Sequence, residues 1–294
     1  MNQTEPQTEA QTVESMVPAA LGETRIGPVT FAWGTRTFVM GIVNVTPDSF
    51  SGDGLLRADA STGDAVALAR TMADEGADLL DIGGESTRPG HTAVVAHEEI
   101  RRVVPVVAAI RAALPSMPIS IDTTKPAVAA AALDAGADLI NDVWGVGEDD
   151  ALVRLAAERR VPIVLMHNRA EPRYRDLMSE VAADLERAIE RALRVGIGWT
   201  DILVDPGFGF GKTAEHNLEL LRELGSLRRL GRPILLGASR KSTLGKVLDL
   251  PTTERLEATI ATTVLGIAGG ADIVRVHDVR PNVRAARMTD AVLR

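Results

Sequence analysis

Polar side chains follow several short apolar runs of the sequence, at the point where each run ends. The clearest cases are Asp122, Asn141 and Asp205. A carboxylate beside buried apolar residues is poorly solvated unless it meets a partner. Two carboxylates and an amide would suit a flat heterocycle with several N–H donors, because a carboxylate can pair in bidentate fashion with a guanidine-like edge. The alternative is a structural cap or salt bridge, which explains one strand-end aspartate better than three polar groups on one face.

Cations end two further runs. One run leads into Ser239, Arg240 and Lys241, and another leads into Arg275 and His277. In an acidic chain, cations gathered at strand ends indicate an anionic substrate group, because Arg and Lys pair with phosphate or carboxylate oxygens. Exposed charges that neutralise nearby acids are the alternative.

Two oxygen donors, Asn44 and Asp48, follow the first apolar run. They could hold Mg²⁺ beside an anionic group, because Mg²⁺ is commonly bound by few protein oxygens together with phosphate oxygens. The chain contains no cysteine. Thiol nucleophiles, disulfides and thiolate metal sites are therefore excluded.

A glycine-rich stretch at 207–213 is superficially similar to a nucleotide-binding loop. The pattern G-x-x-x-x-G-K-[ST] needs glycine at position 206, which is Pro206 here, so we expect no nucleotide at this loop. Phe208 and Phe210 lie between glycines, and aromatic side chains on site loops can sandwich planar ligands. Packing in the core is their alternative fate. His167 also ends an apolar run, and we assign it no role because a lone histidine is more often structural.

These residues need a scaffold that brings strand ends together. The expected strands cover 38–43, 79–82, 119–121, 139–140, 161–166, 202–204, 234–236 and 273–274. Helical patterns with apolar residues at three- and four-residue spacing cover 61–75, 98–113, 126–134, 149–159, 177–194, 215–223, 255–268 and 281–292. Eight βα units predict an α/β fold of the (β/α)8 or TIM-barrel class rather than an open doubly wound sheet. The carboxyl ends of all strands of such a barrel lie on one face.

The chain has 294 residues and is expected to form one domain over 25–294, after a disordered tail over 1–24 that is rich in Gln, Thr and Glu. Residues 29–38 predict a short β-hairpin that turns at 34–36 and plugs the barrel floor. The net charge of −8 argues against a nucleic-acid partner. No apolar stretch reaches the length of a membrane span, and we expect a cytoplasmic protein.

Seven motifs resemble those of dihydropteroate synthases and follow the family's order. They are Gly41–Ser51, Asp81–Gly90, Ile121–Thr123, Ile140–Asp142, Asp205–Lys212, Gly237–Ser242 and Arg275–Asp278. The resemblance covers about residues 29–294. It implies condensation of (7,8-dihydropterin-6-yl)methyl diphosphate with 4-aminobenzoate in folate biosynthesis, giving 7,8-dihydropteroate and diphosphate. It also implies SN1-like loss of diphosphate, Mg²⁺ as cofactor and a homodimer.

The resemblance further implies roles for individual residues. Those expected to bind substrates are Thr87, Asp122, Asn141, Asp205, Phe210, Lys241, Ser242, Arg275, Val276 and His277. Within this set, the expected pterin contacts are Asp122, Asn141, Asp205 and Lys241, and the expected diphosphate contacts are Thr87, Arg275 and His277. Those expected to act on the reaction are Asp48, Arg88, Lys241, Arg275 and His277, with Asn44 as the metal ligand.

One stretch departs from the family's pattern. Residues 168–174 stand where many relatives carry a longer loop, which leaves open the shape of the fifth βα loop and a pterin contact of Met166. Two alternative functions share parts of the pterin pocket. A corrinoid-type pterin methyltransferase would need no diphosphate site, and a non-catalytic pterin-binding paralogue should have lost part of the loop at 84–90 or the pair Arg275 and His277.

Overall fold

The computed structural model describes residues 21–45, 62–85, 94–147 and 149–294. Within these residues, eight parallel strands surround the molecular axis: β3 (Phe38–Asn44), β4 (Leu79–Gly83), β5 (Ile119–Asp122), β6 (Leu139–Asp142), β7 (Ile163–Met166), β8 (Ile202–Asp205), β9 (Leu235–Leu236) and β10 (Ile273–Val276). Neighbouring strands pair in the order β8-β7-β6-β5-β4-β3-β10-β9. A parallel bridge between Val204 and Ile234 joins the two ends. The predicted α/β barrel class is confirmed.

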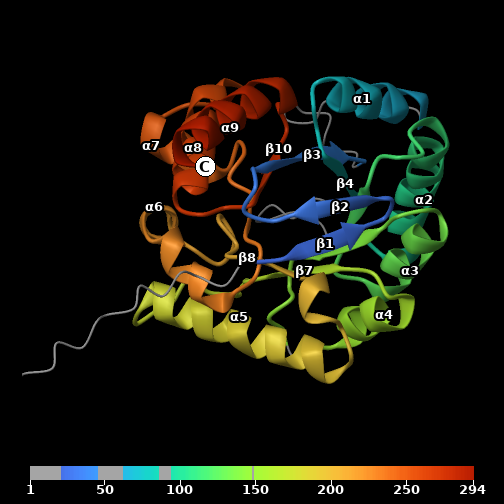
Figure 1. Ribbon diagram of the computed structural model, residues 1–294, viewed down its shortest axis with the longest axis horizontal. Helices are drawn as coiled ribbons and strands as arrows, with labels where there is room; N and C mark the ends of the chain where they lie inside the picture. The colour runs from blue at the N-terminus through green and yellow to red at the C-terminus, as the bar shows by residue number, and fades with distance from the viewer. Residues whose placement is uncertain (1–20, 46–61, 86–93, 148) are drawn as a thin grey trace, which may run out of the picture.

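Helices cover the outside of this barrel (Figure 1). They are α1 (Thr62–Asp74), α2 (Ala96–Ala113), α3 (Pro126–Asp134), α4 (Ala151–Arg159), α5 (Leu177–Arg194), α6 (Ala214–Arg222), α7 (Ser242–Leu248), α8 (Leu256–Ala268) and α9 (Val279–Leu293). Short 3-10 helices lie at Trp199–Asp201, Leu224–Leu230 and Thr252–Glu254. The predicted helices are confirmed within a few residues, and α7 is an addition that the periodicity did not indicate. No helix in the described ranges is long and apolar enough to cross a membrane.

Three of the turns that lead from a helix to the next strand have the same local structure, a left-handed glycine followed by an aspartate. Gly76, Gly136 and Gly270 are left-handed, with φ of +99°, +112° and +95°. The Gly-Ala-Asp copies at these turns end in an aspartate that accepts from a strand amide. Asp138 Oδ2 accepts from the amide of Ile119 at 2.9 Å, and the other two aspartates do the same for β3 and for the residue before β9. The repeated turns therefore fix where strands begin.

The N-terminal hairpin closes the floor of the barrel (Figure 1). Its strands are β1 (Glu23–Ile26) and β2 (Val29–Ala32), which pair in antiparallel fashion. A buried cluster joins the hairpin to one interior residue from most strands: Ile26, Phe31, Trp33, Phe38, Met40, Leu79, Leu139, Val164, Leu203, Leu235 and Ile273. The predicted plug is confirmed.

The position of the hairpin turn was predicted wrongly. The chain turns between β1 and β2 at Gly27, whose φ of +55° suits glycine. Residues 34–36 instead lead the chain from the hairpin into the barrel. Glu23 and Thr24, expected in the tail, belong to β1, because their strand pairs with β2 and Thr24 accepts a hydrogen bond from Trp33 Nε1 at 2.9 Å. Residues 1–20 of the expected tail lie outside the described ranges.

Two-residue alternation along each strand links this floor to the polar ends. Side chains two residues apart point to the same side of a strand. Leu139, Leu203 and Ile273 pack in the floor cluster. Two residues further along the same strands, and on the same interior side, lie Asn141, Asp205 and Arg275. The apolar floor and the polar mouth are therefore successive layers of one barrel interior.

Candidate active site

A buried ion-pair cluster occupies the middle of the barrel mouth. Arg275, from β10, donates from Nε to Asp81 Oδ2 at 2.6 Å and from Nη2 to Asp122 Oδ2 at 2.7 Å. Asn141 Nδ2 donates to the same Asp81 oxygen at 3.2 Å. Asp81 is fully buried, and Asp122 and Asn141 are nearly so. A buried charge needs a partner, and the guanidinium provides one to both carboxylates.

Three acceptors of this cluster have no hydrogen-bond partner. Asp81 Oδ1, Asp122 Oδ1 and Asn141 Oδ1 are buried and unpaired in the described part of the chain. Leaving such groups unsatisfied costs about 1–3 kcal/mol each. Burial, partly offset by Arg275 and reinforced by Asp81, raises the pKa of Asp122 to about 7. The mouth therefore presents acceptor oxygens to a ligand that brings N–H donors.

Asp205 stands opposite this cluster at the end of β8. Its Oδ1 accepts from the amide of Gly207 at 2.7 Å. Burial raises its pKa to about 6, against the effects of the Gly207 amide and of Lys241. Met166 lies beside Asp205 in strand register. Met166 is therefore in the strand layer that carries Asp205, and its pterin contact stays a prediction.

Lys241 and Phe210 meet beside Asp205. The ammonium of Lys241, at the start of α7, lies 3.7 Å from the centre of the Phe210 ring. A Cβ at position 209 would lie 2.9 Å from Lys241 Cδ, so glycine leaves room for this approach. Ser242, the first residue of α7, is exposed next to Lys241. The predicted neighbours Phe210, Lys241 and Ser242 are therefore together.

His277 follows β10 and is held by a serine. Its backbone amide donates to Ser239 Oγ at 3.2 Å, and its Nδ1 lies 2.9 Å from the same hydroxyl oxygen. Arg275 and His277 point into the barrel mouth by alternation. Val276, between them, packs in the hydrophobic core under the helices, so its side chain faces away from the site.

Two sequence expectations need correction. Phe208 does not line the mouth, because its ring is buried in the main core. Arg240 is turned away from the other cations. Its backbone is left-handed with φ of +56°, and its guanidinium pairs with Asp278 at 2.7 Å.

Three predicted residues cannot be placed. Asp48, Thr87 and Arg88 lie outside the described residues, as do Pro89 and Phe50. The structure also adds residues that the sequence reasoning did not choose. Asp81 is the main one, and its signal was a lone carboxylate inside an apolar run.

Asn44 is the predicted metal ligand that lies within the described residues. No group of three or more metal-ligating side chains occurs among the described residues. A Cβ at Gly83 would lie 3.7 Å from Asn44 Oδ1 and 3.8 Å from Asp122 Oδ2, so the glycine leaves both oxygens facing one space. One amide oxygen beside a carboxylate suits Mg²⁺ that takes its remaining ligands from phosphate and water. The residues present therefore fit this ion.

Comparisons with known proteins agree with this geometry. The family model described as "Pterin binding enzyme" matches residues 40–277. The dihydropteroate synthase of Clostridium beijerinckii is 50% identical over 271 residues, which cover 92% of this chain and 99% of that protein.

Solved structures give the same result. The dihydropteroate synthase of Clostridium difficile, determined in the presence of pteroic acid, is 48% identical with a TM-score of 0.84, covering 90% of this chain and 99% of that one. The Xanthomonas albilineans enzyme with 4-aminobenzoic acid is 43% identical with a TM-score of 0.84, covering 92% of this chain and 98% of that one. The chain therefore belongs to the dihydropteroate synthase family of pterin-binding enzymes.

Proposed function

We propose that this chain condenses (7,8-dihydropterin-6-yl)methyl diphosphate with 4-aminobenzoate, and that its barrel mouth is divided between the parts of these substrates. The observation that carries the proposal is the group of unpaired buried acceptors at the barrel mouth, Asp81 Oδ1, Asp122 Oδ1 and Asn141 Oδ1. A pterin ring carries adjacent N–H donors on one edge. Those donors would satisfy acceptors that are costly to leave buried and unpaired.

The pterin end of the site would use carboxylates as acceptors. Asp122 and Asn141 would take N–H groups from one edge of the ring, and Asp205 would take N–H groups from another. Lys241 would donate to a ring acceptor. An ionised carboxylate forms a stronger hydrogen bond with an N–H donor than a neutral one does. Binding would therefore favour the ionised form of Asp122.

The diphosphate end would use cations. Arg275 donates two of its five N–H groups to Asp81 and Asp122. Its remaining N–H groups would meet diphosphate oxygens. His277, held by Ser239, and Thr87 would lie on the same side. Mg²⁺ held by Asn44 and Asp48 would supply positive charge that neutralises the leaving group.

The reaction follows from this division. The bond between the pterin methylene and the diphosphate oxygen breaks, and its electron pair leaves with the diphosphate. Arg88, Arg275 and His277 stabilise that charge as it grows. The electron-rich pterin and the carboxylates Asp122 and Asp205 stabilise the cation left on the methylene, so the path is SN1-like.

The amine of 4-aminobenzoate completes the reaction. Its nitrogen lone pair forms the new C–N bond, and the nitrogen then loses a proton to the departing diphosphate or to water. Lys241, Phe210 and Ser242 would position the aminobenzoate next to the methylene, because they lie together at the rim. Orientation of the two reactants replaces a covalent enzyme intermediate.

One assay tests this function. Purified protein is mixed with the pterin diphosphate, 4-aminobenzoate and Mg²⁺, and released diphosphate and 7,8-dihydropteroate are measured. We expect release that needs all three additions. Folded protein that gives no release above background with intact substrates would overturn the proposal, and pterin binding without release would favour the non-catalytic paralogue.

We further propose that the protein is a homodimer. Exposed apolar side chains gather on the adjacent helices α8 and α9: Val264, Leu265, Met288, Val292 and Leu293. Large exposed apolar patches mark interaction surfaces. Light scattering should give twice the chain mass, and Leu265→Glu with Met288→Glu should give the monomer mass. The cytoplasmic location expected from the sequence stays a prediction, which cell fractionation would test.

A further inference from the structure

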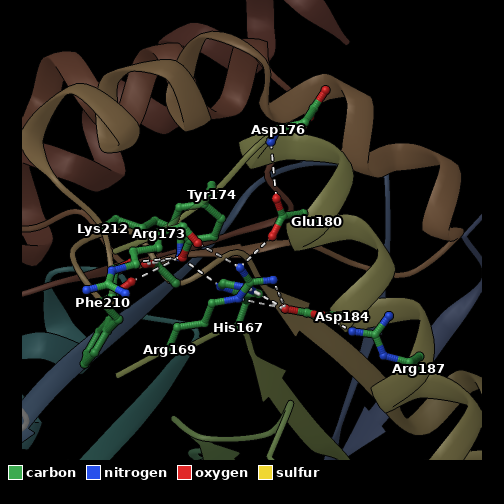
Figure 2. Close-up of polar contacts among 12 residues, drawn as sticks. His167, Arg169, Arg173, Tyr174, Asp176, Glu180, Asp184, Arg187, Phe210 and Lys212 are labelled. Atoms are coloured by element: carbon green, nitrogen blue, oxygen red, sulfur yellow. Dashed lines mark hydrogen bonds and ion pairs between the residues drawn. The ribbon is translucent and has the colours of Figure 1, made fainter. Parts of the chain in front are cut away.

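Lys212 ends the glycine-rich loop, but its ammonium points back into that loop. Its Nζ donates to the carbonyl oxygens of Gly207 and Phe210, both at 3.1 Å, and lies 2.9 Å from His167 Nδ1 (Figure 2). An ammonium has three N–H donors and no acceptor. All three donors are therefore engaged within the protein, in a loop whose lysine would bind phosphate if it were a nucleotide site.

The partners of His167 fix its tautomer. Nε2 lies 3.2 Å from Asp184 Oδ2, a carboxylate oxygen that accepts, so the ring proton lies on Nε2. Nδ1 therefore accepts from Lys212, whose pKa burial lowers to about 7. Burial and the charge of Lys212 lower the pKa of His167 to about 3, against the opposing effect of Asp184, so the ring is neutral. Asp184, from α5, thus orients the ring that orients Lys212.

The 207–212 loop packs tightly against the loop after β7. Gly207 and Gly211 are left-handed, with φ of +72° and +53°. A Cβ at either position would collide with a backbone carbonyl, that of His167 in one case and that of Arg169 in the other. The loop after β8 is therefore packed directly on the loop after β7. Only glycine allows that approach.

The loop at 168–174 also contacts the 207–212 loop. Tyr174 donates from its hydroxyl to the carbonyl of Gly211 at 2.9 Å. Arg169 lies over the Tyr174 ring, 4.6 Å from its centre, and pairs with Asp184 at 2.7 Å. Figure 2 shows these side chains converging on the 207–212 loop from the β7 side.

The residues that Lys212 holds are the ones that reach the site. Gly207 donates its amide to Asp205 at 2.7 Å. Phe210 places its ring under the ammonium of Lys241. We propose that Lys212 and His167 are positioning residues, which hold the 207–212 loop so that Phe210 and Lys241 form the 4-aminobenzoate side of the site. This inference rests on the proposed function.

A pair of substitutions at His167 separates the two contacts of its ring. In His167→Asn, the amide oxygen stands near the place of Nδ1 and can still accept from Lys212. In His167→Gln, the amide nitrogen reaches toward Asp184, and the acceptor for Lys212 is lost. We expect the KM for 4-aminobenzoate to stay within about twofold in His167→Asn and to rise about tenfold in His167→Gln.

Lys212→Met tests the other partner. It removes the three donors and keeps an unbranched apolar side chain that is one atom shorter. We expect the KM for 4-aminobenzoate to rise about tenfold, with kcat and pterin affinity within about threefold, because Asp205 is anchored in β8 and loses little. A purely structural defect would lower the amount of active enzyme, and thus the apparent kcat, without raising this KM. Lys246→Met, on the exposed face of α7, is the matched control and should change neither constant.

Hydrogen exchange gives a readout that needs no activity. The amides of residues 207–212 should exchange at least about tenfold faster in Lys212→Met, while those of α2 should keep the wild-type rate. If the wild-type protein releases no diphosphate, the proposed function fails, and exchange alone judges the loop. If the wild type is active and Lys212→Met is folded with unchanged KM and unchanged exchange, the positioning role is overturned.

Discussion

Arg275 Nη2 lies 2.7 Å from Asp122 Oδ2, and this contact joins the two ends of the proposed site. The same guanidinium faces Asp81 with its Nε at 2.6 Å. A diphosphate bound to Arg275 and a pterin bound to Asp122 would thus be coupled electrostatically, because these two residues form one ion pair. In the proposed mechanism, bond breaking at the methylene would take place between these two groups.

Asp122→Asn should weaken pterin binding. The change keeps an acceptor but removes the charge, and hydrogen bonds to a charged group contribute about 1.5–3 kcal/mol. We expect affinity for a pterin ligand, measured by calorimetry, to fall about tenfold or more. Asp142→Asn is the matched control. Asp142 ends β6 beside Asn141 but accepts from the Trp144 amide at 2.9 Å instead of facing the mouth, so this variant should bind pterin normally.

Pterin binding should depend on pH through Asp122. Its pKa is about 7 in the ligand-free protein, because burial outweighs the nearby Arg275 and Lys241, and Asp81 and Glu99 add to the rise. The carboxyl group is therefore mostly protonated below pH 7, and losing that proton gives it the stronger, charge-assisted bonds with N–H groups. Affinity should fall about tenfold per pH unit as the pH drops below 7.

Calorimetry in buffers of different ionisation enthalpy should show proton release on binding near pH 6. In Asp122→Asn the release from this group should vanish, leaving a smaller dependence at lower pH from Asp205, whose pKa is about 6. An affinity for the pterin ligand that stays constant between about pH 5.5 and 8, a range that brackets both pKa values, would contradict the assignment.

The strand ends were predictable because their signal is local. Asn141 and Asp205 follow apolar runs directly, and alternation then places them in the barrel interior. The seven motifs predicted the family, which the comparisons confirm. Asp81 could not be chosen in this way, because its importance depends on Arg275, which lies 194 residues away in the sequence.

Other errors have equally physical causes. Gly27 and Gly34 both fit a turn, and only the pairing of Glu23 with Ala32 decides between them. Phe208 sits between glycines, which predicts exposure, yet the loop folds back and buries the ring in the main core. The sequence pattern around Lys212 bears only on phosphate binding. The contacts of Lys212 with carbonyl groups of its own loop depend on the tertiary fold.

Ser239→Ala should slow the reaction with little effect on pterin binding. Ser239 holds His277 by two contacts, with the ring nitrogen at 2.9 Å and the backbone amide at 3.2 Å. Without the hydroxyl, His277 would be less well placed for the leaving diphosphate, and kcat should fall about tenfold. Steady-state kinetics check this, and an unchanged kcat would remove Ser239 from the proposal. Ser239→Thr keeps the hydroxyl and should restore part of the rate.

Lys125→Met should destabilise the fold. Lys125 pairs with Glu99 at 2.7 Å and also with Glu85, two residues after β4. Glu85 in turn accepts from the amide of Val94 at 2.9 Å, two residues before α2. Glu99 is fully buried. Removing its cation leaves a buried charge, so urea unfolding should show a free energy lower by about 2–4 kcal/mol.

The double variant Lys125→Met with Glu99→Gln separates charge from packing. If the buried charge is the cause, neutralising Glu99 should recover more than half of the lost free energy of unfolding, because the uncompensated carboxylate is gone. Glu99→Gln alone should cost less than Lys125→Met alone, since Lys125 keeps Glu85 as a partner. A double variant as unstable as the sum of the two single variants would show instead that the methylene packing of Lys125 carries the effect.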